Sequence, residues 1–181
     1  IYAIAIGPQS GQNTQGSAAI AIGINAGRTA QTANAIALGV QAGGSTQGSG
    51  AIAIGYQAGQ TQQTINAMAI GIQAGQGTQG SGAIAIGYQA GQTQQSINAV
   101  AIGVGSGAST QGPSTVAIGV SAGQTSQQSG SIAIGYQSGQ IIQGVQSIAI
   151  GVNAGQSTQG QTAVAIGVQA GQTAQGVNAL A

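Results

Sequence analysis

The sequence contains no Asp, Glu, His or Cys, and Arg28 is its only charged side chain. The charged fraction is 1%, whereas about a quarter of the residues in an ordinary globular domain are charged. General acid–base and covalent catalysis draw mainly on carboxylates, imidazoles, thiols and amines. None of these groups is present in a side chain, and the remaining candidates are the hydroxyls of Ser, Thr and four Tyr, which have no base partner. We therefore expect that the chain is not an enzyme.

The same absences bear on ligands. Metal ions bind to His, Cys or carboxylates, so we expect no metal and no cofactor. One Arg cannot neutralise the phosphates of a nucleic acid or form a polybasic membrane anchor. The apolar runs are short and cut by Gly, far below the roughly 20 residues of a membrane helix, so no membrane span is expected. Low charge favours association, and copies of the chain itself are the expected partner.

The sequence begins at Ile1 without a Met or a basic stretch, which does not fit a signal peptide. We therefore expect a segment of a longer or processed polypeptide. Residues 1–181 form a single repeat domain in this interpretation. The first and last repeats resemble the middle ones, and uncapped solenoid ends expose strand edges that pair further. The segment would then continue in a longer chain or stack end to end in a fibre.

One Gly recurs every 16 residues, without insertion or deletion, at positions 7, 23, 39, 55, 71, 87, 103, 119, 135, 151 and 167. A 16-residue period is too short for helical repeats or propeller blades. It suits one coil of two short strands and two turns. The predicted fold is therefore an all-β parallel β-solenoid, or β-roll, of eleven 16-residue coils, and stacking at the strand spacing would give a rod roughly 50 Å long.

Aligned repeats give sixteen columns, with column one at the first Ala of blocks such as Ala51-Ile52-Ala53-Ile54-Gly55. Columns two and four are aliphatic, column six continues the alternation with residues such as Tyr56, and column eight is mostly Ala. Because neighbouring strand residues face opposite sides, we expect columns two, four, six and eight to line the inside. Columns one, three and five, which are mostly Ala or Gly, would face outward, either as a tolerated small surface or because another backbone approaches there.

Columns five, nine and thirteen are invariant. Gly occupies columns five and nine, and since Gly adopts positive φ without steric cost, each coil should bend at both. Column thirteen is always Gln, and it predicts either an amide ladder of the kind that supports stacked β-structure or a neutral polar surface. The candidate ladder residues are Gln15, Gln31, Gln47, Gln63, Gln79 and Gln95.

Columns eleven and twelve are mostly Thr or Ser. Three interpretations are open: solvated strand residues, O-glycan acceptors or an ice-binding face. An ice-binding face needs a regular lattice of Thr, which is interrupted at positions such as Gly77 and Ile141. The candidate O-glycan sites are Thr14, Thr29, Thr46, Thr61, Thr78 and Thr93. Arg28 is expected to be a solvated surface residue.

The block Ala-Ile-Ala-Ile-Gly-x-x-Ala-Gly at 51–59 and 83–91 resembles the head repeats of trimeric autotransporter adhesins and related fibre proteins. The resemblance implies a left-handed parallel β-roll, three chains side by side, an extracellular location and adhesion or surface coating. The small Ala face would fit such a subunit contact. Its candidate self-association residues are Ala5, Ala21, Ala37, Ala53, Ala69 and Ala85.

Two functions follow from these patterns. The first is a structural protein that forms an extracellular filament, fibril or stalk, at a cell or virion surface, by stacking and self-association as a lateral trimer or end-to-end fibre. The alternative is an adhesin head that binds host matrix or glycan, with ice binding a third. Recognition sites commonly break a repeat with loops or with exposed aromatic and charged anchors, and we expect none in this regular repeat.

Overall fold

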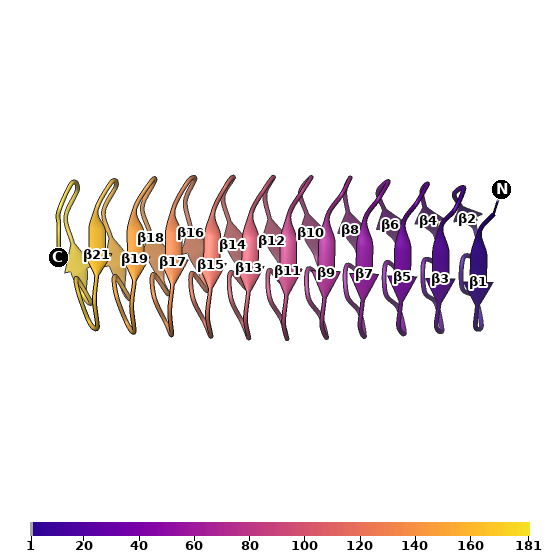
Figure 1. Cartoon of the computed structure of the whole chain (residues 1–181), viewed down its shortest axis with the longest axis horizontal. Helices are drawn as coiled ribbons and strands as arrows, with labels where there is room; N and C mark the ends of the chain where they lie inside the picture. The colour runs from indigo at the N-terminus through magenta and orange to yellow at the C-terminus, as the bar shows by residue number, and fades with distance from the viewer. Residues whose placement is uncertain (1) are drawn as a thin grey trace.

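The computed structural model describes residues 2–181. They form a rod of stacked coils, with the two chain ends at opposite ends of the rod (Figure 1). The sheet of longer strands, here called the long sheet, consists of β1 (Ile4–Ile6), β3 (Ile20–Ile22), β5 (Ile36–Leu38), β7 (Ile52–Ile54), β9 (Met68–Ile70), β11 (Ile84–Ile86), β13 (Val100–Ile102), β15 (Val116–Ile118), β17 (Ile132–Ile134), β19 (Ile148–Ile150) and β21 (Val164–Ile166).

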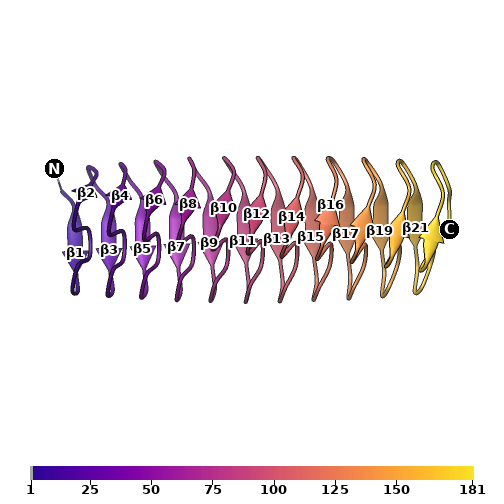
Figure 2. The ribbon, with the colours of Figure 1, turned by 180° about the vertical axis from the view of Figure 1, so that it is seen from behind.

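The second sheet, here called the short sheet, has two-residue strands. It consists of β2 (Thr14–Gln15), β4 (Ala30–Gln31), β6 (Thr46–Gln47), β8 (Gln62–Gln63), β10 (Thr78–Gln79), β12 (Gln94–Gln95), β14 (Thr110–Gln111), β16 (Ser126–Gln127), β18 (Ile142–Gln143), β20 (Thr158–Gln159) and β22 (Ala174–Gln175). Each sheet has eleven strands, and every strand pairs in parallel with the equivalent strand of the next coil. The view from behind shows the same order of coils (Figure 2).

The register follows the sequence period. Ala37 pairs with Ala53 and Gln47 with Gln63, an offset of 16 residues, and the same offset holds along both sheets. Like residues therefore stack on like residues throughout the rod. The prediction of an all-β parallel β-solenoid of eleven 16-residue coils is confirmed.

The interior is lined by the small residues, not the large ones. Ala53, in the middle of β7, has no exposed area, and neither has Ala58 of column eight. On the same strand Ile52 and Ile54 face outward and are half-buried. The prediction that columns two, four and six line the inside is therefore wrong, and it is right only for column eight.

The physical reason is the short distance between the sheets. A single Gln side chain crosses the interior, since Nε2 of Gln31 on β4 donates to the backbone oxygen of Ile20 on β3 at 2.7 Å. A gap of that width has room for Ala opposite Gln but not for Ile. Where Ser replaces Ala, its hydroxyl is satisfied locally, as when Ser147 donates to the carbonyl of Gly144 at 2.8 Å.

The conformation of the turns explains why Gly, Gln and Asn recur between the strands. Gly of column five has φ near +127°, as at Gly55, and Gly of column nine has φ near +52°, as at Gly59. The two predicted bends per coil are thus confirmed. Columns seven and sixteen are left-handed as well, for example Gln57 and Asn66, both with φ of 56°. Asn tolerates this region better than most residues, while Gly adopts it freely.

Candidate functional site

The Gln column forms a buried hydrogen-bonded ladder between the sheets. Nε2 of Gln79 donates to Oε1 of Gln95 at 2.9 Å, and Nε2 of Gln95 donates to Oε1 of Gln111 at 2.8 Å. The chain of bonds runs from Gln31 to Gln175. Gln15 lies outside it and donates instead to the carbonyls of Ile4 and Ala19. The candidate ladder residues from Gln31 to Gln95 are therefore joined as the sequence predicts, and they are internal supports rather than a surface.

The candidate self-association residues lie elsewhere than expected. Ala21, Ala37, Ala53, Ala69 and Ala85 have no exposed area, and only Ala5 in the first coil is exposed. The backbone that approaches this column belongs to a turn of the same chain, since a Cβ built at Gly27 would lie 3.3 Å from the Cβ of Ala21. The five buried alanines therefore cannot form a surface that another copy contacts, and the prediction of a self-association face along this column is corrected.

The surface that lies open instead is the outer side of the long sheet. Its rows are columns two and four, which carry Ile, Val, Leu or Met on every strand. Most of these side chains are half-buried, as Ile54 and Ile86 are, whereas Leu38 of β5 is 42% exposed and Ile118 of β15 is 37% exposed. Column six follows in the next turn, and its side chains from Ile24 onward are 39% to 72% exposed. We call columns two and four the aliphatic face.

Most of the candidate O-glycan residues are accessible. Thr14, Thr46, Thr61, Thr78 and Thr93 are exposed, and Thr29 is half-buried. A depression of about 400 Å³ lies between Thr61 and Thr93, where Gly77 has no side chain.

Two further amide ladders lie at the surface, and the sequence interpretation missed them. In column seven, Gln57 donates to Gln41 at 2.8 Å and Gln73 to Gln57 at 3.1 Å. In column ten, Gln76 donates to Gln60 at 3.1 Å. The signal was available, because Gln recurs in these columns, but Gly44, Gly105 and Ala108 interrupt the repetition.

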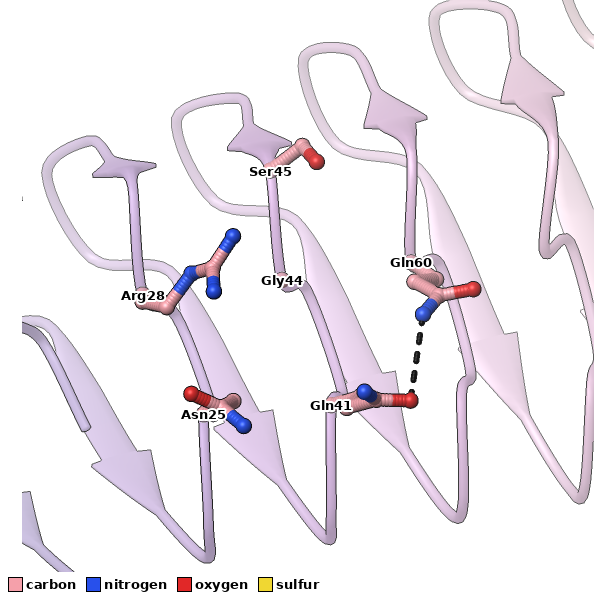
Figure 3. A pocket seen from close by; sticks show the side chains of 6 residues that line it. All are labelled: Asn25, Arg28, Gln41, Gly44, Ser45 and Gln60. Carbon is pink, nitrogen blue, oxygen red and sulfur yellow. Dashed lines mark hydrogen bonds between the residues drawn. The ribbon is translucent and has the colours of Figure 1, made fainter. Parts of the chain in front are cut away.

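At Gly44 the missing side chain of column ten opens a small cavity. Its volume is about 70 Å³, and its lining residues are Asn25, Arg28, Gln41, Gly44, Ser45 and Gln60. Figure 3 shows the side chain of Arg28 extending toward the next coil, which carries Gly44 and Ser45. Gln60 closes the far side by donating to Oε1 of Gln41 at 3.2 Å (Figure 3). Arg28 is exposed, so its predicted surface position is confirmed.

Among residues 2–181, no cluster of three or more His, Cys, Asp or Glu residues could hold a metal ion. Within the same described part of the chain, no helix is long and apolar enough to cross a membrane.

The fold and the ladders define the class of the protein: it is a β-solenoid repeat protein with an amide-bridged interior. No protein-family model, curated protein or solved structure matches the chain.

Proposed function

We propose that the chain is the structural unit of an extracellular filament, fibril or stalk, and that copies of it associate side by side through the aliphatic face. The observation that carries the proposal is the position of the large apolar residues. They lie outside a closed interior, in two continuous rows along the whole rod. A contiguous exposed apolar patch of this kind commonly marks an interaction site.

The size of the face reaches the minimum for a specific contact. A strand of three residues is about 10 Å long, and eleven strands stacked along the rod extend over about 50 Å. The aliphatic face of each copy therefore has an area of roughly 500 Å². Two copies would bury roughly 1,000 Å², which reaches the lower limit for a specific interface. Every additional coil in a longer polypeptide would extend the same contact.

A second copy fits this face better than an unrelated partner does. The apolar rows of two copies have the same spacing along the rod, so the side chains of one copy can pack between those of the other at every coil. Charge places no restriction on the pairing, because Arg28 is the only charged residue in the chain. The similarity of the repeat motif to trimeric adhesin heads also favours three chains side by side.

The proposed location is outside the cell, at a cell or virion surface. Exposed Thr residues of the short sheet, such as Thr46 and Thr78, would carry O-glycans. The glycans would lie on the short sheet and the aliphatic face lies on the long sheet, so the glycans would not block contact between copies. A bundle could therefore bury its apolar rows and present a hydrated surface.

The test places three positive charges on one sheet at a time. The variant I54K/I86K/I118K adds a Lys to β7, β11 and β15 of the aliphatic face, and T46K/T78K/T110K adds the same charge at the same spacing to the short sheet. All six side chains point out of the coil, so both variants should fold. We expect the first to sediment as single rods and the second to remain associated.

Equal association of the two variants would contradict the proposed face. Circular dichroism of each variant is the control, since a loss of β-structure would make the comparison one of folding rather than of contact.

A further inference from the structure

We propose that the cavity at Gly44 binds a single carboxylate group of an external ligand. The proposal concerns a site separate from the aliphatic face and does not depend on self-association. It rests on the kinds of atoms that line the cavity, on its size and on the charge balance of the chain.

Four polar groups around the cavity are donors without acceptors, and the one buried atom without a partner there, Oδ1 of Asn25, lies on the side of Asn25 that faces away from Gln41 (Figure 3). The guanidinium of Arg28, Nδ2 of Asn25, Nε2 of Gln41 and the hydroxyl of Ser45 donate no hydrogen bond to any atom of residues 2–181. Figure 3 shows the nitrogens of Asn25 and Gln41 on the sides that face the space between them. The oxygen of Gln41 is already engaged by Gln57 and Gln60.

This arrangement interrupts the pattern seen farther along the rod. In the coils of Gln57, Gln73 and Gln89, each column-seven nitrogen donates to the oxygen of the preceding coil. At Gln41 the preceding residue is the shorter Asn25, and no bond joins the two side chains. The shorter side chain and the missing side chain of Gly44 therefore leave donors and empty space at the same place.

A carboxylate matches these donors in charge, shape and size. Its charge balances that of Arg28, and the planar guanidinium suits carboxylate oxygens in a bidentate arrangement. The neutral donors of Gln41 and Ser45 add bonds without adding charge, which favours a monoanion. A cavity of about 70 Å³ holds one such group and not a whole sugar. Because the chain contains no Asp or Glu, the carboxylate of a side chain must come from another molecule.

The ligand is either a free small carboxylate or a uronic acid unit of an acidic polysaccharide. Acetate in equilibrium dialysis against the full chain probes the first source. Immobilised polygalacturonate probes the second, with its methyl ester as the matched ligand without charge. We expect millimolar binding of acetate to one site per chain, since the cation is exposed and screened. Binding to the polymer and not to its ester would identify the polysaccharide as the source.

Two variants test the site. R28Q/Q140R keeps the net charge and moves the cation to the same column in another coil, where Gln124 and Gln156 occupy the neighbouring positions. G44Q restores the Gln of column ten and fills the cavity; its Cβ would lie 3.3 Å from the carbonyl oxygen of Gln41, a tight contact that needs a small shift of the backbone. We expect each to weaken carboxylate binding at least tenfold.

The proposal is overturned if R28Q/Q140R binds as well as the unaltered chain, since charge alone would then suffice. It is equally overturned if neither acetate nor polygalacturonate binds, or if the ester binds as well as the acid. Should G44Q fold poorly by circular dichroism, R28Q/Q140R decides the question, because both of its substitutions exchange Arg and Gln in an outward column.

Discussion

Gln of column thirteen shows how one residue type determines the thickness of this molecule. Gln95 is 1% exposed, and its amide nitrogen donates both to Gln111 and to the carbonyl of Ile84 on the opposite sheet. Its oxygen accepts from Gln79 at 2.9 Å. The side chain therefore joins neighbouring coils and also joins the two sheets, so a Gln at every coil holds the interior at one width.

The substitution Gln95→Leu should destabilise the rod strongly, because it leaves buried polar groups of Ile84, Gln79 and Gln111 without this partner. The expected loss is about 1–3 kcal/mol for each unsatisfied group. The matched control is Gln92→Leu, at a half-buried surface position, where we expect a change within about 0.5 kcal/mol. Denaturant unfolding measures both. Similar losses at the two positions would mean that the interior ladder has no special role.

At the scale of the element, the coil depends on turns that only certain backbones can make. Gly87 follows β11 with a φ of 128°, and a Cβ built there would lie 2.7 Å from the carbonyl oxygen of Gly103 in the next coil. Both the conformation and the close approach exclude a side chain. Each coil thus ends its long strand at a fixed point, and this keeps the register of the following coil.

We expect Gly87→Ala to weaken the rod, because L residues rarely adopt this φ and the neighbouring backbone would have to move. The cost should exceed the roughly 1 kcal/mol typical of strained backbone sites. Gly44→Ala is the control, since its φ is not positive and its nearest neighbour is 3.3 Å away. Thermal unfolding followed by circular dichroism compares the two, and an equal shift in melting temperature would refute this account of the turn.

The sequence predicted the elements well and their orientation poorly. The period of 16, the strands and the two Gly bends follow directly from repetition, because parallel stacking places like residues together. Alternation shows that Ile52 and Ala53 face opposite sides, but it does not show which side is inside. Large aliphatic residues such as Ile are usually the buried ones, so the sequence favours Ile in the interior. The structure places Ala there, because the distance that Gln63 spans between the sheets leaves room only for a small side chain. That distance depends on tertiary structure and cannot be seen in the sequence.

The candidate sites divide in the same way. The buried ladder could be predicted because Gln95 and its equivalents never vary. The cavity at Gly44 could not, since it arises where Asn25, Arg28 and Gly44 depart from their columns in adjacent coils. Only the stacking of coils brings these departures together.

For the whole molecule, the inverted placement of large and small residues separates the side chains that stabilise the coil from those that we propose to mediate assembly. The interior of Ala and Gln is closed within one chain, and nearly every backbone group of the strands bonds to a neighbouring coil. The aliphatic residues lie outside this interior, and in the proposed assembly they contact other copies of the chain. Repeat arrays are held by contacts between neighbouring repeats, so such a rod can lengthen without changing its lateral surface.

The most direct test of lateral association is the mass per unit length of the native particle, measured by electron microscopy of unstained specimens. The chain of 17.1 kDa extends over roughly 50 Å, so a single rod should weigh roughly 3 kDa per nanometre at the strand spacing. We predict a value of two or more times this mass, with three times expected for a trimer. Particles that remain at the single-rod value at every protein concentration would contradict the proposal that the aliphatic face joins copies of the chain.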